Sequence, residues 1–429
     1  MKLDRLFVMC ASLAIAPALT GSNGVARPQD MMHMDHGADS TAKFHWGLSG
    51  IVLGTRESPA VDGRTLTEGY LSQPMFMGSG VLPRYGFALD LTLNLERWTL
   101  ERGELNAGMF GEGYVDRRHP HTYLHEVIAT WKKDLDANAV LSATAGKGFV
   151  PFGTDDPMMR PFVKYPVNHH LAQIPERAIV VAAAAFGPVG LEASSFGGDE
   201  PESPSDWPNS SRFFDSWAAR ATARIRKASE FQVSYAKVVS PEIAAGGGLT
   251  HKKWSASGRY ESKLLYGLAE FERTQEVESG RDAFSFKSML AEGSLTRKKF
   301  SVAGRLEQTE RAEEERDANP FRTPRPASDL SILGRTRWTI ATMSASRSFA
   351  VRKTTLAPFI EVGRAHVAGL DRFQVFDPGS FYGSDVMWSF SAGVRFGVGM
   401  MMNRMGRYGA ALARESMNMG EMEGMEMNQ

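Results

Sequence analysis

The chain has 429 residues, with 49 acidic and 49 basic side chains and a sequence pI near 7.2. This balance gives no electrostatic reason to expect a nucleic-acid partner, since such proteins usually carry an excess of positive charge. The mean hydropathy is −0.27, and no apolar run reaches the roughly 18 residues of a membrane-spanning helix, which excludes a helical membrane protein. The length also excludes a single soluble core of ordinary size, but it suits one large barrel.

Residues 1–26 are predicted to be a secretory signal peptide. Lys2 and Arg5 give a basic start, Leu6–Leu19 is apolar, and small residues at 24–26 form a cleavage site. The alternative is a short buried helix. Because the only cysteine, Cys10, lies in this segment, the mature chain would contain none. A closed, hydrogen-bonded barrel is expected to supply the stability that disulfides give other secreted proteins.

Residues 27–43 are predicted to form a flexible tail rich in methionine and histidine, and residues 400–429 a tail rich in methionine. The candidate metal ligands are Met31, Met32, His33, Met34, His36, Met417, Met419, Met422, Met425 and Met427. Thioether sulfur suits Cu(I), and imidazole suits Cu(II) and zinc. The run MMHMDH resembles the Met/His runs of the copper resistance protein B family, and this resemblance implies copper as a candidate cofactor. The alternative is a flexible tail of biased composition without a ligand.

Residues 44–399 alternate apolar with polar or small side chains in stretches of about ten residues. In the clearest stretch one parity holds Trp388, Phe390, Ala392, Val394, Phe396 and Val398, and the other holds Met387, Ser389, Ser391, Gly393 and Arg395. Successive side chains of a strand point to opposite faces, so each stretch has one apolar and one polar face. The pattern predicts an all-β fold, a transmembrane antiparallel β-barrel.

The connections between these stretches alternate in length. Short turns are expected near 99–103, 134–138, 186–189, 226–229, 260–263, 296–299 and 349–353. Long connections are expected at 55–83, 113–121, 148–177, 197–213, 240–250, 275–282, 309–328 and 367–385. This order predicts about 16 strands (roughly 14–18), with both chain ends on the periplasmic side where the short turns lie. Residues 67–77 are the weak point, because they could form another strand.

The parity of each stretch assigns charged side chains to the lumen, since on the lipid face each would cost about 2–4 kcal/mol near the midplane. The inward basic residues by this criterion are Arg220, Arg224, Arg226, Lys253, Arg259, Lys299, Arg305, Arg335, Arg337 and Arg395. Fewer acids are assigned inward, namely Asp90, Glu96, Glu261 and Glu307. An excess of positive charge would favour anions. Alternatively, the charges pair with one another and fill the lumen.

Residues 146–153 read Gly-Lys-Gly-Phe-Val-Pro-Phe-Gly, and a Glu-Arg pair follows at 176–177. This stretch resembles the strand-to-loop signature of the phosphate-selective porin O/P-like family, although its spacing departs slightly. The resemblance implies sixteen strands and a long loop that folds into the channel and narrows it. Loop 148–177 is the candidate, and its basic residues are Arg160, Lys164, His169, His170 and Arg177. The alternative is a loop that covers the barrel from outside.

Other chemical motifs are weak. His119 and His121 offer too few ligands for a closed metal site, and the adjacent His169 and His170 rarely converge on one ion. The sequence contains no Gly-x-Ser-x-Gly, phosphate-loop or zinc-protease signature. We therefore expect a Gram-negative outer-membrane porin, without enzymatic activity, for passive diffusion of small, anionic solutes.

Its expected partners are outer-membrane lipid and small solutes or ions, without nucleic acid, and a homotrimer is a candidate assembly. An outer-membrane copper-binding or copper-resistance protein is the main alternative, and a barrel hydrolase is the third.

Overall fold

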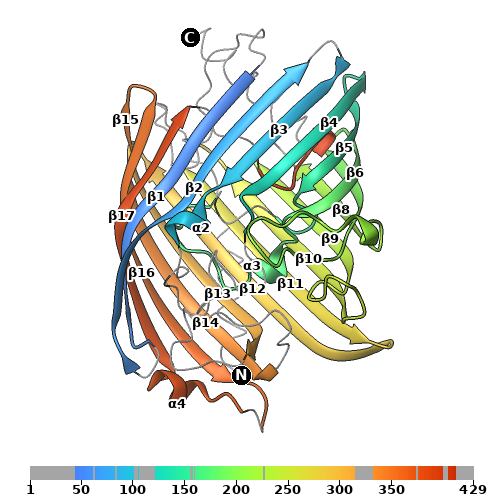
Figure 1. The fold of residues 1–429 in the computed structure, drawn as a ribbon. Coiled ribbons are helices and arrows are strands. Elements are labelled where there is room, and N and C mark those ends of the chain that lie inside the picture. The colour runs from blue at the N-terminus through green and yellow to red at the C-terminus, as the bar shows by residue number, and fades with distance from the viewer. Residues whose placement is uncertain are drawn as a thin grey trace.

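A computed structural model describes residues 44–411 apart from 61–62, 83–84, 101–104, 106–120, 155–157, 159, 226–227, 315–331, 373–374 and 400–403. One antiparallel sheet closes on itself to form a barrel (Figure 1). Its strands are β1 (Phe44–Ser58), β2 (Leu66–Leu82), β3 (Phe87–Asn94), β4 (Leu124–Asp136), β5 (Ala139–Gly148), β6 (Arg177–Phe186), β7 (Val189–Phe196), β8 (Ser216–Ile225), β9 (Ser229–Val239), β10 (Thr250–Glu261), β11 (Leu265–Glu278), β12 (Arg281–Arg297), β13 (Phe300–Glu314), β14 (Ile332–Arg347), β15 (Phe349–Val351), β16 (Thr354–Gly369) and β17 (Val386–Gly399).

The seventeen strand segments correspond to sixteen strands of the barrel wall. β14 and the three-residue β15 both pair with β16, and only Ser348 separates them, so together they form one interrupted strand of the wall. The wall closes where β1 pairs with β17, from Gly47 opposite Gly399 to Ser58 opposite Trp388. The predicted all-β transmembrane barrel of about 16 strands is confirmed.

The order of the connections was predicted correctly in most places and wrongly at the start. Residues 67–77 belong to β2, so the expected long connection at 55–83 is mostly strand. The expected turn at 99–103 lies mostly outside the described residues, and the short helix α2 (Glu96–Thr99) precedes it. β3 pairs directly with β4, which leaves no place in the wall between them for another strand. β2 is a strand that was not counted, and the strand expected between β3 and β4 has no place in the wall, so the total number of strands is unchanged.

The connection expected at 275–282 is much shorter than predicted. β11 ends at Glu278 and β12 begins at Arg281, so only Ser279 and Gly280 join them. Both have positive φ, +48° and +82°, as a type I′ hairpin turn requires. Because this tight turn lies at the end where most connections are long, the long strands β11 and β12 form a projecting hairpin (Figure 1).

The outer surface of the wall is apolar. Large side chains such as Leu89, Val233, Met343 and Ile360 are exposed there, while their neighbours in sequence face inward. Exposed aromatic side chains lie toward the strand ends, as at the interfaces of a membrane. The rings of Tyr235 and Trp254 on β9 and β10 are 4.4 Å apart at their centroids. None of the helices in the described part of the chain is long and apolar enough to cross a membrane.

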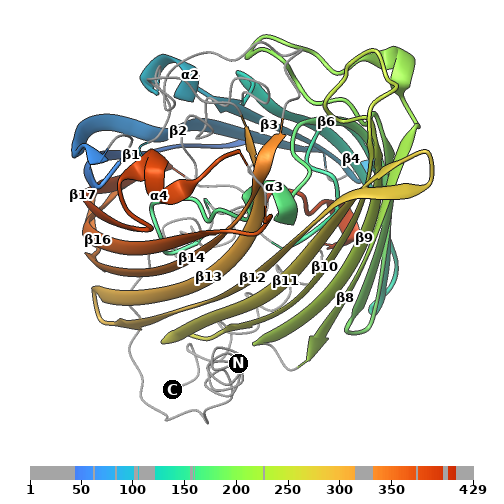
Figure 2. The same ribbon diagram turned by 90° about the horizontal axis from the view of Figure 1, so that it is seen from below.

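Figure 2 looks into the barrel and shows α3 (His169–Ala172) enclosed by the wall. Two segments fill much of the interior. One is the connection between β5 and β6, residues 149–176, which we call the inward loop. The other, residues 404–411 after β17, we call the C-terminal segment, and it ends in the 3₁₀ turn Gly409–Ala411. The segment expected as a C-terminal tail, 400–429, therefore contains buried residues at 404–411.

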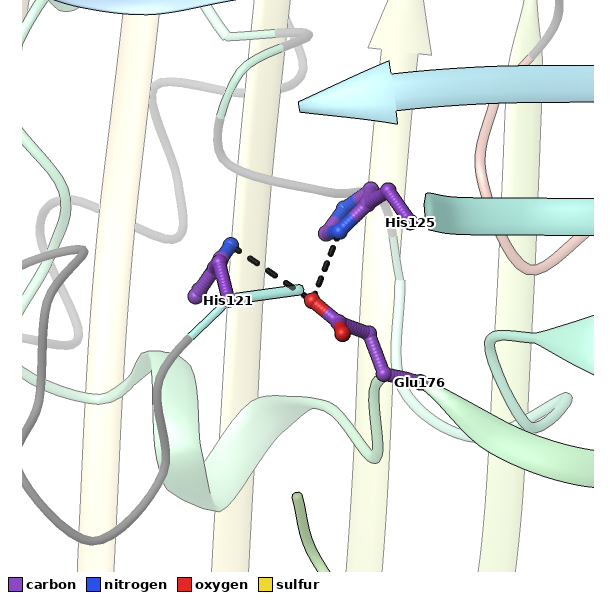
Figure 3. A group of neighbouring side chains, drawn as sticks. All are labelled: His121, His125 and Glu176. Carbon is purple, nitrogen blue, oxygen red and sulfur yellow. Dashed lines mark hydrogen bonds and ion pairs between the residues drawn. The ribbon is translucent and has the colours of Figure 1, made fainter. Parts of the chain in front are cut away.

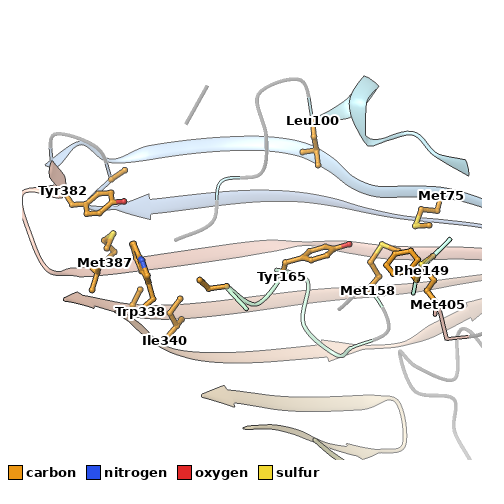
Figure 4. Packing of buried hydrophobic residues seen from close by; sticks show 14 of the residues in the cluster. Met75, Leu100, Phe149, Met158, Tyr165, Trp338, Ile340, Tyr382, Met387 and Met405 are labelled. Carbon is orange, nitrogen blue, oxygen red and sulfur yellow. The ribbon is translucent and has the colours of Figure 1, made fainter. Parts of the chain in front are cut away.

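Apolar side chains of these segments meet apolar side chains of the wall (Figure 4). Phe149 and Tyr165 of the inward loop and Met405 of the C-terminal segment belong to a buried cluster that also contains Met75 and Trp338. α4 (Pro378–Tyr382) contributes Tyr382, whose ring lies edge-on to Trp338 at 5.9 Å between centroids. The interior therefore has an apolar core as well as polar groups.

Candidate functional site

The sequence motif at 146–153 turns the chain into the barrel. Gly146 and Gly153 have φ of +148° and +68°, which residues with a Cβ rarely adopt. A Cβ on Gly153 would lie 1.7 Å from the carbonyl oxygen of Ala172 in the same loop. At Gly148 a Cβ would approach the hydroxyl of Tyr408 to 2.7 Å. These glycines thus allow β5 to end against the C-terminal segment and the inward loop to fold back on itself.

Arg160 fixes the middle of the inward loop to the wall. Its Nη1 and Nη2 atoms donate to the two carboxylate oxygens of Glu270 on β11 at 2.9 and 3.0 Å. Its Nε lies 3.8 Å from Glu292 on β12. Burial opposes the charged form, but these two carboxylates outweigh it and raise the pKa of Arg160 above its usual value. A bidentate pair of this kind holds position as well as charge.

Wall carboxylates also bind the backbone of the inward loop. The amide of Val163 donates to Glu361 on β16 at 3.1 Å, and the amide of Val167 donates to Glu307 on β13 at 2.8 Å. In the opposite direction, Arg395 on β17 donates to the carbonyl oxygen of Phe162 at 2.8 Å. The loop is therefore attached to β13, β16 and β17 as well as to β11. This placement supports the predicted loop that enters the barrel rather than covering it.

The other predicted basic residues of this loop have separate partners. Lys164 is buried, lies 3.7 Å from Glu57 and donates to the carbonyl of Leu105. Arg177, the first residue of β6, donates to Glu200 at 2.5 Å. The ring of His169 is edge-on to that of Tyr165, 5.3 Å between centroids. The side chain of His170 lies outside the described part of the structure.

Predicted arginines of β8 hold the C-terminal segment. Arg220 pairs with Glu192 through two hydrogen bonds of 2.6 and 2.7 Å and donates to the carbonyl of Gly406 at 2.6 Å. Arg224 donates to Glu230 at 3.1 Å and to the carbonyl of Ala411 at 2.9 Å. Both side chains face the lumen as predicted. Arg226 lies outside the described residues.

The inward assignment of Arg335 and Arg337 is wrong. On β14 the buried parity belongs to Thr336, Trp338 and Ile340, which places both arginines on the outer parity. They lie at the strand end, where Arg335 pairs with Asp371 and Arg337 with Glu310, each at 2.6 Å. Trp338 and Ile340 face the apolar core, so hydrophobicity does not mark the lipid face here.

The expected shortage of inward acids is also wrong. Asp90, Glu96, Glu261 and Glu307 face inward as predicted, but many further acids are buried beside them. These are Glu57, Glu126, Glu176, Glu192, Asp199, Glu270, Glu272, Glu292, Glu313 and Glu361. The buried basic side chains are Lys147, Arg160, Lys164, Arg177, Arg220, Lys253, Arg305, Arg395, Arg404 and Arg407. Positive charge is therefore not in excess among the described buried residues.

A further polar group, which sequence reasoning missed, lies where the inward loop ends (Figure 3). His121, His125 and Glu176 offer ligand atoms within 4.8 Å of one another. His125 lies four residues after His121, and Glu176 belongs to the Glu-Arg pair noted in the motif. The sequence does not reveal the group because Glu176 is far from both histidines along the chain. Its charge is fixed locally: burial would raise the pKa of Glu176, but His125, His121 and Lys147 lower it to about 2.

The methionines and histidines of the two tails, Met31 to His36 and Met417 to Met427, and the expected signal peptide all lie outside the described residues. The structure therefore leaves the copper expectation as a prediction.

No protein-family model matches this chain. Among curated proteins, none matches its sequence. Solved structures with a similar fold include an anion-selective porin from Comamonas acidovorans, with 9% identity, a TM-score of 0.48, and coverage of 82% of this chain and 99% of that one. The outer membrane channel DcaP of Acinetobacter baumannii has 9% identity, a TM-score of 0.46, and coverage of 85% and 99%. OmpT, an outer membrane protein of Vibrio cholerae folded in vitro, has 9% identity, a TM-score of 0.45, and coverage of 84% and 99%.

Proposed function

We propose that the protein is an outer-membrane channel of the porin type, in which small solutes diffuse past an inward-folded loop. The observation that carries this proposal is the inward loop itself, attached inside a closed barrel by Arg160, Val163 and Val167. A loop fixed to the inner wall narrows the lumen without depending on a moving part. The apolar outer surface supports a place in a bilayer, and short turns on one side favour the periplasm for both ends of the barrel.

The finer part of the proposal is small solute size and a weak preference for anions. The two filling segments occupy part of the lumen, which supports small solutes and low conductance. Many basic residues are paired with carboxylates, so the preference for anions over cations is expected to be small. Arg395 supports the preference for anions, because the hydrogen bonds that it donates go to carbonyl oxygens of Arg160 and Phe162, which carry only partial negative charge, and the carboxylate of Glu361 acts on it only at longer range. Its charge acts on permeating ions most strongly at low salt.

Conductance of the purified protein in planar bilayers tests the channel. Reversal potentials in unequal salt should show a weak anion preference that decreases toward 1 M salt, where the Debye length is about 3 Å. Arg395→Gln should shift the reversal potential toward cations. Arg337→Gln, a matched change on the outer parity, should leave it unchanged. Folded protein that gives no conductance above background would contradict the channel, and a wild type that prefers cations would contradict only the selectivity.

The assembly that we propose is a homotrimer. Chemical cross-linking of the folded protein in outer-membrane vesicles should give a species of three chains. A single species at the mass of one chain, under conditions that cross-link a known trimer, would contradict this part alone.

A further inference from the structure

Two histidines and one glutamate meet inside the barrel at the junction of two long connections and the wall. His121 ends the connection between β3 and β4, His125 is the second residue of β4, and Glu176 ends the inward loop. Figure 3 shows the three side chains pointing toward one another. Chain segments more than 50 residues apart therefore bring ligand atoms to one place, and no part of the proposed channel function requires this arrangement.

The two oxygens of Glu176 have different surroundings. Oε2 accepts from the amide of Thr122 at 2.9 Å and from its hydroxyl at 2.5 Å, and it lies 3.7 Å from the Nζ of Lys147. Oε1 also accepts from the amide of Thr122, at 3.2 Å, and it faces both imidazoles: Nδ1 of His125 is 2.7 Å away and Nδ1 of His121 is 3.9 Å away. Thr122 thus fixes the carboxylate in an orientation that aims Oε1 between the two rings.

The rings are also held in place. They stack with 5.2 Å between centroids and 16° between planes, and the ring of His125 lies edge-on to Phe149. Asn94 lies 3.4 Å from Nδ1 of His121, which is consistent with that nitrogen acting as an acceptor. His125 and Glu176 are almost fully buried, at 1% and 3% exposure, whereas the His121 side chain is 12% exposed. Solvent therefore reaches the group from the His121 side.

We propose that His121, His125 and Glu176 form a binding site for one divalent transition-metal ion of zinc-like chemistry. Two imidazoles and one carboxylate are a set of ligands that zinc accepts with a fourth position open to water. The Nδ1 of His125 faces an ionised carboxylate and so carries a proton in the metal-free protein. Binding of the ion displaces that proton from Nδ1, so that the neutral ring carries its proton on Nε2, and bonds of about 2.0–2.2 Å replace the His125–Glu176 hydrogen bond.

The positive charge of Lys147 provides a specific test of where the ion binds. Its ammonium group lies on the Oε2 side of Glu176, where it repels a cation bound at Oε1. Lys147→Met should therefore tighten binding of the ion. Adventitious binding elsewhere on the molecule would not respond to this change, so the variant distinguishes this group from the tails.

Zinc binding to the full-length protein, folded in detergent, tests the proposal. Every variant carries His33→Asn and His36→Asn, so that the imidazoles of the N-terminal tail do not contribute. Isothermal titration with Zn²⁺ should show one site that His121→Asn with His125→Asn weakens by about tenfold or more. Asparagine keeps a polar atom near the position of Nδ1, which favours folding. His366→Asn, at a histidine paired with Asp385 on the outer rim, is the control and should bind zinc normally.

Anomalous diffraction at the zinc edge locates the ion in wild-type crystals and needs no variant to fold. The expected peak lies within bonding distance of both Nδ1 atoms and Oε1. Equal zinc binding by the folded double variant, or a peak only at other residues, would overturn the proposal. Loss of zinc in that variant together with normal bilayer conductance would separate this site from the channel function.

Discussion

The inward loop and the C-terminal segment fill the same barrel by different means. The inward loop is covalently anchored at both ends and receives its main contacts from carboxylates on β11, β13 and β16. The C-terminal segment leaves the wall once, after β17, and lies against β4 to β9. Here the segment contributes the arginines and the wall contributes the carboxylate, because Arg404 and Arg407 donate to Glu230 on β9 at 3.0 and 2.7 Å.

The difference predicts that the two segments are displaced from the interior with unequal ease. Release of the inward loop would leave several wall carboxylates buried without their donors, while both ends of the loop remain tied to strands. Release of the C-terminal segment breaks a smaller set of contacts and frees a chain end, which gains conformational entropy. The inward loop is therefore the fixed part of the interior, and the C-terminal segment is the more easily displaced part.

The largest expected effect is at Glu270, which holds the inward loop. Glu270→Gln removes the charge of the bidentate partner of Arg160 and leaves the buried guanidinium with the longer contact to Glu292, so the free energy of unfolding should fall by about 3 kcal/mol. Urea unfolding in lipid vesicles measures this change. Glu310→Gln breaks the outer pair with the half-exposed Arg337 and should cost less than about 1 kcal/mol. Equal costs for the two variants would mean that the loop is not fixed by this contact.

The C-terminal segment can be displaced at Gly409. A Cβ there would lie 2.3 Å from Oγ of Ser142, at a φ of +51°, so Gly409→Val should disfavour the docked state by about 1–3 kcal/mol. A cysteine introduced at the buried Ala411 reports docking, since the predicted mature chain has no other. Maleimide labelling should be faster in Gly409→Val than in the parent. Gly190→Val, which has no atom within 4 Å of the added Cβ, is the control.

Acid should weaken the attachment of the inward loop at its end. The pKa of Glu176 is depressed to about 2, below its ordinary 4.5, so its stabilisation is present above about pH 4.5 and is lost as the pH falls toward 2. A shift of this size corresponds to about 3 kcal/mol as an upper figure. Unfolding free energies measured between pH 6 and 2 should fall more steeply for wild type than for Glu176→Gln. Parallel curves for the two proteins would contradict the depressed pKa.

The smallest effect on the fold is expected from the tails beyond the two ends of the barrel. Sulfur outnumbers imidazole there eight to two, so we predict tighter binding of Cu(I) than of Zn(II). Deletion of 27–42 and 412–429 should abolish Cu(I) uptake and leave the barrel folded by circular dichroism. The second deletion starts at 412 because Ala410 and Ala411 are packed inside the barrel. Undiminished Cu(I) uptake by the shortened chain would rule out the tails as the site.

The alternation of side chains was enough to predict the barrel, but it failed at β2. This strand contains Gln73 with a φ of +52° and Pro74, and the register of its pairing with β1 shifts between Ser49 and Ile51. A bulge reverses the parity within a strand, so no single alternating pattern runs through it. The composition then resembles a loop, although the stretches on both sides of Gln73 and Pro74 pair with β1.

The interior was harder to predict, because alternation separates two faces but does not say what the inner face contacts. On β14 the inner face is apolar at Trp338 since it meets α4 and the core. On β11 the inner face combines Leu268 with Glu270 and Glu272, so neither parity looked polar throughout. The group of His121, His125 and Glu176 depends on where two loops end, which local patterns do not encode.

The C-terminal segment also bears on the order in which the molecule assembles. Residues 404–411 follow β17, which closes the seam with β1, but they contact strands about half-way around the ring. These contacts can form only when that part of the wall is already present, so docking of the segment is a late step. An interaction that is absent from the transition state slows unfolding and does not accelerate folding. Loss of the segment should therefore shorten the lifetime of the finished barrel without hindering its formation.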